Sequence, residues 1–243
     1  MTTAPHALVI AAPGTNRHPD VMFALQQAGA TASSVNLVQL AANPTVLNDA
    51  QMLVIAGGFS FADALGAGRL FALELEHIIG DGIQQFAAQG KPVIGICNGF
   101  QTLVRMGVLP GALDAALGHN ELGGFQCRWV NIKPISRKCA WTQHLSDEIY
   151  CPIAHGEGRF ACDDDTLAQL QRNDQVALTY SGSNPNGSLG DIAGICDETG
   201  MILGLMPHPE NHVLSRQHPQ FHRGRRDGLG LHLFTQGVRI ANS

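Results

Sequence analysis

The sequence predicts an α/β fold, with a mostly parallel, twisted sheet that carries helices on both faces. Short continuous apolar runs alternate with longer segments of helical spacing through the first half of the chain. Unbroken apolar runs are typical of parallel strands buried on both faces. Only 14% of the 243 residues are charged and 44% are hydrophobic, which favours a compact body with much buried surface. We expect a single domain over residues 1–243.

The first half predicts strands and helices in alternation. The predicted strands cover residues 7–11, 35–40, 52–56 and 93–96, and the predicted helices cover residues 20–28, 65–88 (interrupted at 80–82) and 100–106. The first helix is expected to stop at Gly29, because glycine readily adopts the backbone conformation that follows a helix. Right-handed crossovers then place the strand ends, and any site, along one edge of the sheet.

The second half is richer in strands. The predicted strands cover residues 127–132, 149–154, 176–180, 192–196 and 201–206. Runs of this kind usually extend a parallel sheet with antiparallel strands, which is what we expect here. No repeat, low-complexity segment or linker divides the chain.

Charge and composition exclude several classes of function. A net charge of −5 and a pI of about 6.1 do not attract a phosphate backbone, so no nucleic-acid partner is expected. The short basic run at residues 223–226 is too small to bind an anionic membrane, and no apolar run approaches the ~20 residues of a membrane span. The six cysteines form no C-x-x-C pair, so no disulfide framework is expected. These features predict a cytoplasmic protein without a membrane partner.

The segment around Cys97 carries the clearest chemical signal. An apolar strand runs into Gly-x-Cys-x-Gly and then into a helix, which is the cysteine form of the nucleophile elbow. Bulky residues at Gly95 and Gly99 would collide with adjacent backbone in such a turn. The helix N-terminus favours a thiolate at Cys97, and the N–H of Asn98 points to where an oxyanion would form. The alternative, a buried and inert cysteine, does not account for the glycines.

A nucleophilic thiol needs a base, and His208 is the best candidate among the 11 histidines. It follows an apolar strand and lies between Pro207 and Pro209, which hold the local backbone near extended geometry. Residues two apart in an extended segment point the same way, so Glu210 can approach the ring and set its tautomer. The sequence thus predicts a Cys97–His208–Glu210 triad, with a solvated loop histidine as the alternative.

A glycine pair, Gly57-Gly58, ends another buried strand. It can bring a second backbone N–H to the oxyanion hole if its strand neighbours the one before Cys97, whereas a tight turn without function is the other interpretation. Two histidine pairs with i, i+4 spacing, His208/His212 and His218/His222, could suit zinc on a helix. A proline interrupts each pair, so we predict no metal site.

Seven segments of the sequence, taken together, match the motifs of a known protein family. They are residues 12–17, 57–60, 63–69, 95–101, 127–130, 155–160 and 206–210. They resemble the class I, triad-type glutamine amidotransferases, and within that class the glutaminase subunits of phosphoribosylformylglycinamidine synthase in purine biosynthesis. The resemblance extends over nearly the whole chain. Its Cys-Asn-Gly-Phe-Gln and Gly-Gly-Phe-Ser sequences are fairly specific to this branch, whereas Pro-His-Pro-Glu is shared more widely.

The resemblance implies a flavodoxin-like fold and a role for each member of the triad. Cys97 attacks the side-chain amide of glutamine, His208 passes the thiol proton to departing ammonia, and Glu210 orients His208. Water then releases glutamate from the thioester.

The resemblance also implies the groups that surround the substrate. Gly58 and Asn98 supply the oxyanion hole through main-chain N–H groups, and Gln101 matches the family residue that holds glutamine. Residues 120–125 correspond to a loop that contacts the α-groups of the substrate, but Leu122 and Gly124 depart from the family pattern there.

The segment from His155 to Arg159 leaves its role open. A catalytic or interface role is one interpretation, and a structural role, with Glu157 paired to Arg159 or to a partner, is the other. The sequence does not choose between them.

The resemblance implies that ammonia passes to a large synthetase subunit, often accompanied by a further small subunit. There ATP, with magnesium, drives conversion of formylglycinamide ribonucleotide to the amidine. Independently, the chain has no G-x-x-x-x-G-K-[ST] phosphate loop, so no cofactor is expected in this chain.

Three other functions stay open. The chain could be an amidotransferase that feeds another synthetase, a related cysteine hydrolase of the same fold, or a subunit that keeps the fold only to bind a partner. A hydrolase of that group typically has a histidine after the elbow cysteine, where this chain has Asn98. A non-catalytic subunit would be expected to lose a member of the triad.

Overall fold

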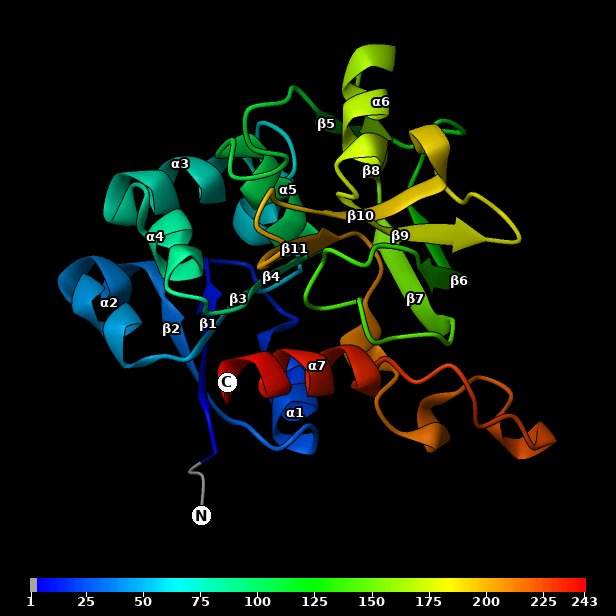
Figure 1. The fold of residues 1–243 in the computed structure, drawn as a ribbon, viewed down its shortest axis with the longest axis horizontal. Helices are drawn as coiled ribbons and strands as arrows, with labels where there is room; N and C mark the ends of the chain where they lie inside the picture. The colour runs from blue at the N-terminus through cyan, green and yellow to red at the C-terminus, as the bar shows by residue number, and fades with distance from the viewer. Residues whose placement is uncertain (1–3) are drawn as a thin grey trace.

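The structure, a computed structural model, describes residues 4–243 and is built on one large sheet (Figure 1). The strands are β1 (His6–Ala11), β2 (Thr31–Asn36), β3 (Met52–Ile55), β4 (Val93–Ile96), β5 (Ala116–His119), β6 (Gln126–Pro134), β7 (Ile149–His155), β8 (Glu157–Ala161), β9 (Val176–Ser181), β10 (Ile192–Cys196) and β11 (Ile202–Leu205). The α-helices are α1 (His18–Gln27), α2 (Leu37–Ala42), α3 (Arg69–Ile79), α4 (Gly82–Ala88), α5 (Asn98–Arg105), α6 (Asp164–Arg172) and α7 (Leu231–Ala241). Nine strands form the large sheet in the order β2-β1-β3-β4-β11-β10-β9-β6-β7, and β5 pairs with β8 in a small second sheet.

The half of the sheet that contains β1, β3, β4 and β11 is parallel throughout. β2 and β1, β1 and β3, β3 and β4, and β4 and β11 all pair in parallel register. Every residue of β3, β4 and β11 is buried, as unbroken apolar runs predict for strands covered on both faces. The predicted α/β class is therefore confirmed.

The other half of the sheet is antiparallel, as expected for the strand-rich second half of the chain. β10, β9, β6 and β7 each pair antiparallel with their neighbours. The expectation for residues 201–206 was wrong on one side, because β11 runs parallel to β4. Gly204 pairs with Gly95 in that register, and β11 is antiparallel only to β10. β11 is thus the strand at which the sheet changes direction.

The prediction of a strand at residues 35–40 was also wrong. The strand β2 ends at Asn36, and helix α2 begins at the next residue. The side chain of Asn36 accepts a hydrogen bond from the N–H of Gln39 at 2.9 Å, and the Gln39 side chain accepts one from the N–H of Asn36 at 3.0 Å. This capping box starts a helix that buries Leu37 and Leu40, so the apolar run serves a helical face rather than a strand.

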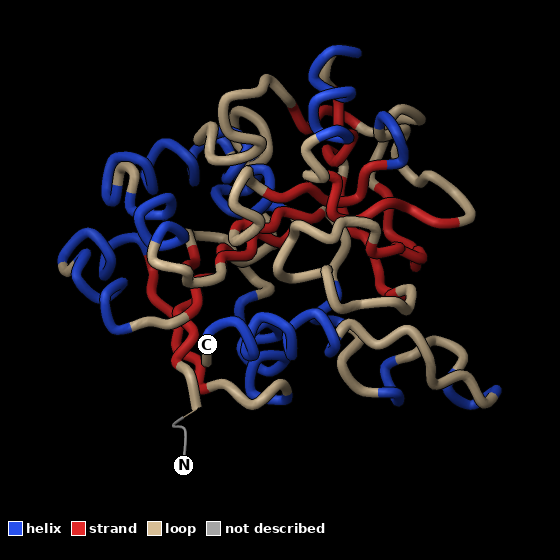
Figure 2. Tube along the Cα trace, viewed as in Figure 1, coloured by secondary structure: helices blue, strands red, loops and turns tan. Residues whose placement is uncertain are grey.

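Helices cover both faces of the sheet (Figure 2). α1 and α7 pack together on one face, and α3 packs on α5, which contacts β4 and β11, on the other. The predicted helix over residues 65–88 is interrupted near Gly80 as expected, but it begins later, at Arg69. Leu65, Gly66 and Gly68 adopt left-handed backbone conformations that a helix cannot include. No helix within residues 4–243 combines the length and apolar character needed to cross a membrane.

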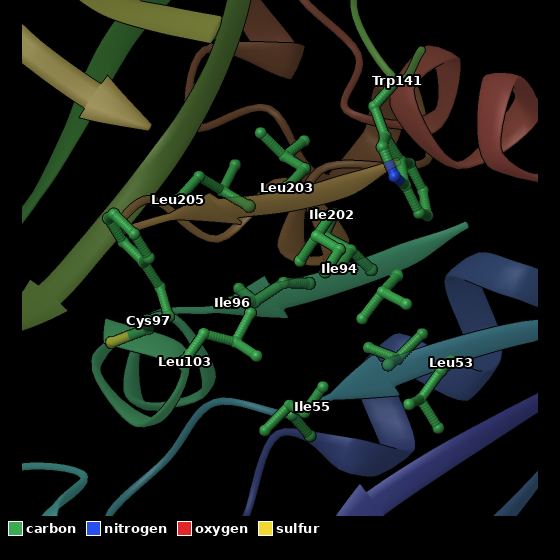
Figure 3. Packing of buried hydrophobic residues seen from close by; sticks show 14 of the residues in the cluster. Leu53, Ile55, Ile94, Ile96, Cys97, Leu103, Trp141, Ile202, Leu203 and Leu205 are labelled. Carbon is green, nitrogen blue, oxygen red and sulfur yellow. The ribbon is translucent and has the colours of Figure 1, made fainter. Parts of the chain in front are cut away.

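The core of the parallel half leads directly to the predicted nucleophile. Ile94 and Ile96 of β4 pack among apolar side chains of β3 and β11, and Leu103 of α5 covers them. Figure 3 shows Cys97 at the carboxyl end of β4, beyond these side chains. The sheet edge expected to hold a site is therefore the edge at which β4 and β11 end.

Candidate active site

The turn between β4 and α5 holds Cys97 in a strained conformation, with φ 51° and ψ −106°. A side chain at Gly99 would collide with the carbonyl oxygen of Ile55 on the neighbouring strand, and one at Gly95 would lie 2.8 Å from the Gly99 carbonyl oxygen. These clashes explain both glycines of the predicted elbow. Strain of this kind costs of order 1–3 kcal/mol and persists only where the surrounding packing imposes it. The parallel strands supply that packing.

His208 follows β11, the strand next to β4, and therefore reaches the same edge as Cys97. Its backbone N–H donates to the carbonyl oxygen of Pro152 at 2.8 Å, and its Nδ1 lies 2.6 Å from Oε1 of Glu210. The predicted contact between His208 and Glu210 is present. The predicted extended backbone was wrong, because residues Pro209–Asn211 form a 3₁₀ turn. This turn brings the carboxylate back to the ring.

The charge state of His208 is set by its two neighbours. Burial disfavours the charged imidazolium, but the carboxylate of Glu210 and the adjacent sulfur of Cys97 outweigh it and raise the pKa of His208 to about 10. The Nδ1–H of the ring then donates to Glu210. The ring also lies close to Cys97, since a Cβ at Gly57 would lie 3.0 Å from Cε1 of His208 and 3.3 Å from Cβ of Cys97. Such a pair can hold a thiolate beside an imidazolium at neutral pH.

Two backbone N–H groups of the segments around the elbow have no hydrogen-bond partner within residues 4–243. Neither Gly58 nor Asn98 uses its backbone N–H in a hydrogen bond within residues 4–243. Gly58 has φ 136°, and a Cβ there would lie 2.6 Å from the backbone nitrogen of Asn16. A Cβ at Gly57 would lie 3.0 Å from Cε1 of His208, so only glycine fits between the ring and the strand. The two residues predicted to line an oxyanion hole thus each have an unused backbone N–H.

Gln101 joins a polar network behind the elbow. Its Nε2 donates to the carbonyl oxygen of Glu157 at 2.6 Å, and its Oε1 accepts from Nδ2 of Asn98 at 3.2 Å. The same Nδ2 donates to Asp63 at 3.0 Å. Burial and the nearby charge of Glu157 raise the pKa of Asp63. Gln101 therefore lies in the site, with one amide hydrogen and one lone pair not used by these bonds.

His155 lies at the end of β7, and the sequence left its role open. Its Nδ1 lies 3.0 Å from Oδ1 of Asn120, whereas its buried Nε2 has no partner within residues 4–243. Burial, followed by the charge of nearby His208, lowers the pKa of His155 to about 4. The site therefore contains two histidines, and only one of them is neutral at pH 7. The ion pair of Glu157 with Arg159 is not formed among the described residues.

A second thiol, that of Cys151, lies beside the triad. Burial and then the charge of Glu210 raise the pKa of Cys151 well above its usual value, so it stays protonated and inert. Sequence reasoning missed Cys151 as a member of the site, whereas Asn120 lies in the loop at residues 120–125 that the resemblance indicates. The alternating burial of β7, which places Cys151 and His155 on one face, is the signal that could have found it. No cluster of three or more metal-ligating side chains occurs in the described part of the chain.

Comparison with known proteins agrees with this geometry. A family model described as "CobB/CobQ-like glutamine amidotransferase domain" matches residues 4–240. The phosphoribosylformylglycinamidine synthase subunit PurQ of Treponema denticola is 46% identical over 264 residues, covering 96% of this chain and 98% of that protein. The chain belongs to the PurQ family of glutamine amidotransferases. The PurQ protein of Methanococcus maripaludis strain C7 is 38% identical and covers 89% of this chain and 86% of its own length.

Solved structures give the same result. A chain from the structure of PurLQS from Thermotoga maritima is 34% identical, with a TM-score of 0.79, and the match covers 97% of this chain and 98% of that one. Another Thermotoga maritima protein, a glutamine amidotransferase, shares the fold at a TM-score of 0.59 and 15% identity. The family resemblance and the class I amidotransferase fold predicted from the PurQ-like motifs are both confirmed.

Proposed function

We propose that this chain hydrolyses the side-chain amide of glutamine to glutamate and ammonia. The observation that carries the proposal is the arrangement of Cys97 on the elbow, His208 on the adjacent strand end and Glu210 at 2.6 Å from the ring. The pKa of His208, raised to about 10, keeps the ring protonated beside the sulfur at neutral pH. A protonated acid next to a nucleophile is what amide cleavage requires.

The reaction proceeds in two steps that return the site to its starting state. The sulfur of Cys97 bonds to the amide carbonyl carbon of glutamine, and the charge of the resulting oxyanion falls on the carbonyl oxygen. His208 gives its proton to the nitrogen, the C–N bond breaks, and ammonia leaves a thioester. Water then attacks the thioester as His208 takes its proton, which releases glutamate and restores the pair.

The oxyanion and the substrate are held by groups around the elbow. The unpartnered N–H groups of Gly58 and Asn98 would donate to the oxyanion, and loss of one such donor typically costs about 10²–10³ in kcat. Gln101 would contact glutamine with its remaining donor and acceptor. These steps use only side chains and backbone groups of this chain, together with water.

Ammonia would be used by a separate synthetase. The relatives are named as subunits of phosphoribosylformylglycinamidine synthase, and the Thermotoga maritima chain comes from a PurLQS structure. We therefore infer a large synthetase partner, with a further small subunit, that uses ATP and magnesium to convert formylglycinamide ribonucleotide to the amidine. Copurification with a different synthetase would redirect this part of the proposal without affecting the glutaminase step.

The test is covalent labelling with 6-diazo-5-oxo-norleucine, a reactive glutamine analogue, followed by intact-mass measurement and peptide mapping. We expect one adduct on Cys97, which is lost in Cys97→Ser and kept in Cys127→Ser. Cys127 is the exposed cysteine, whereas Cys97 is buried, so a reagent that merely follows exposure would label Cys127. In the complex, Cys97→Ser should abolish glutamine-dependent synthesis and keep ammonia-dependent synthesis. Absence of a Cys97 adduct, both in the free chain and with the synthetase, would overturn the proposal.

A further inference from the structure

His155 is a polar group that the proposed reaction does not yet use. It is 4% exposed, close to the 3% of His208 and the 4% of Cys97. The carbonyl oxygen of Ala154, the residue before it, lies 4.0 Å from Sγ of Cys97. The charge of His208 also contributes to the lowered pKa of His155. His155 therefore belongs to the surroundings of the reacting sulfur.

The hydrogen bonds of Asn120 define which nitrogen of His155 carries the proton. Nδ2 of Asn120 donates to two carbonyl oxygens, of Gly124 at 3.0 Å and of His155 at 2.8 Å. This fixes the orientation of the amide, so Oδ1 is the atom that faces Nδ1 of His155. An oxygen without hydrogen needs a donor, and Nδ1 must carry the hydrogen. In the neutral ring Nε2 then has a lone pair and acts only as an acceptor.

That acceptor is buried and has no donor. Nε2 of His155 forms no hydrogen bond within residues 4–243, although the ring lies closely against Gly158, where any side chain would collide with it. A buried polar atom without a partner is costly, and such atoms in native proteins usually have a functional explanation. Near a cysteine nucleophile, the missing donor is most simply a group of the substrate.

We propose that Nε2 of His155 accepts a hydrogen bond from the side-chain amide nitrogen of glutamine, and from the ammonia that this nitrogen becomes. The inference rests on the proposed glutaminase function. The contact would hold the nitrogen end of the amide, and so turn its carbonyl oxygen toward the N–H groups of Gly58 and Asn98. His155 stays neutral throughout and transfers no proton, since His208 supplies the proton for ammonia.

The same lone pair would discriminate the substrate from its product. The amide of glutamine has two hydrogens on its nitrogen, whereas the side-chain carboxylate of glutamate has none. A carboxylate oxygen facing Nε2 would put two acceptors together and leave both unsatisfied in a buried place. His155 would thus disfavour glutamate, and help to release it, without a charged residue.

Two substitutions separate this role from simple anchoring of the loop at residues 120–125. An asparagine side chain can replace Nδ1 of histidine and keep the bond to Asn120, but it does not reach the position of Nε2. A glutamine side chain reaches the position of Nε2 with an acceptor oxygen and loses the donor to Asn120. His155→Asn and His155→Gln are therefore complementary tests.

The experiment measures glutamate release by the full chain in complex with its synthetase. We expect His155→Asn to lower kcat/KM for glutamine by about 10- to 100-fold, the effect of one lost hydrogen bond in a buried site. His155→Gln should stay within about threefold of the wild type, as rescue by an acceptor predicts. Inhibition by glutamate should become stronger in His155→Asn only. Ammonia-dependent synthesis by both complexes serves as the control for folding and assembly.

Labelling by 6-diazo-5-oxo-norleucine identifies which nitrogen atom of glutamine binds to Nε2 of His155. This probe has the α-groups of glutamine but no amide N–H, so the labelling rate of Cys97 should be unchanged in His155→Asn. A labelling rate that falls together with glutamine hydrolysis would assign Nε2 to the α-ammonium group and overturn the proposal. A larger loss in His155→Gln than in His155→Asn would show that anchoring of Asn120 is the whole role. If wild-type Cys97 is neither labelled nor active, the glutaminase function fails rather than this contact alone.

Discussion

His208, in the turn after β11, and His155, at the end of β7, are buried histidines of one site with opposite charge states. Their exposed fractions are 3% and 4%, so burial does not explain the difference. The pKa of His208 is raised to about 10 and that of His155 is lowered to about 4. What differs is the set of neighbouring groups. His208 has the carboxylate of Glu210 at Nδ1 and the sulfur of Cys97 nearby, whereas His155 has the amide of Asn120 at Nδ1.

This difference shows how one fold can use a single residue type in two roles. A carboxylate at Nδ1 makes the ring a proton donor, whereas an amide oxygen leaves it neutral with an acceptor nitrogen. The imidazolium of His208 also makes protonation of His155 less favourable, since two charges would then lie close together in a buried place. The charge of His208 therefore helps to keep His155 neutral.

The largest effect is expected when His208 is given surroundings like those of His155. Glu210→Gln removes the strongest influence that raises the pKa of His208, and burial then lowers that pKa. The wild-type ring stays protonated until the pH approaches about 10, whereas the variant ring loses its proton at lower pH. We expect kcat for glutamine hydrolysis to fall about 10³- to 10⁴-fold, comparable to loss of the orienting carboxylate in a triad. The alkaline limb of the pH–rate profile should move to lower pH.

An exposed carboxylate provides the control for that substitution. Glu148, which accepts a hydrogen bond from Ser181 at the surface, can be changed to glutamine with no expected effect on the profile. An alkaline limb that stays in place in Glu210→Gln would show that Glu210 does not set the charge of His208.

The reverse change gives His155 the surroundings of His208. Asn120→Asp places a carboxylate 3.0 Å from Nδ1 of His155 and should raise the pKa of that ring, now about 4, above its ordinary value. A protonated Nε2 is a donor and no longer an acceptor, so we expect kcat/KM for glutamine to fall about 10- to 100-fold. Histidine titration by NMR and steady-state kinetics check the two effects. The same change in His155→Gln should cause a smaller loss, because only the two hydrogen bonds donated by Nδ2 of Asn120 are then removed.

The smallest effect is expected at Asp63, a carboxylate of the site that contacts neither histidine. It accepts a hydrogen bond from Nδ2 of Asn98 at 3.0 Å. Asp63→Asn weakens one hydrogen bond, and we expect a two- to fivefold loss in kcat/KM, or about 0.5–1 kcal/mol. The pH–rate profile should keep its shape. A shifted profile would mean that the charge of Asp63 also acts on the histidines.

Local sequence patterns were sufficient to predict the neighbours of His208. Cys97 lies between glycines at a strand end, and Glu210 lies two residues from His208, so the contacts follow from short-range geometry. Even there the predicted backbone conformation was wrong, since a 3₁₀ turn rather than an extended segment brings Glu210 to the ring. The chemistry of a short segment can be predicted when its residue types restrict the arrangement, whatever the exact backbone.

The neighbours of His155 could not be predicted, because they depend on contacts between distant segments. Asn120 and His155 are 35 residues apart, and their contact requires the path that brings the loop after β5 to the end of β7. The direction of β11 likewise depends on its neighbours β4 and β10 rather than on its own apolar residues. The apolar run at residues 35–40 is a different case, because the capping pair of Asn36 and Gln39 that begins a helix there is a local signal.

The burial of Cys97 also determines how this protein would resist oxidation. A thiolate is the form that peroxides attack first, and one paired with an imidazolium is unusually susceptible. The sulfur of Cys97 lies in a residue that is only 4% exposed, whereas Cys127 lies at the surface. Peroxide in solution therefore meets the thiol of Cys127 more readily than that of Cys97. Oxidation of the stored protein would then begin at Cys127, a thiol that the proposed reaction does not use.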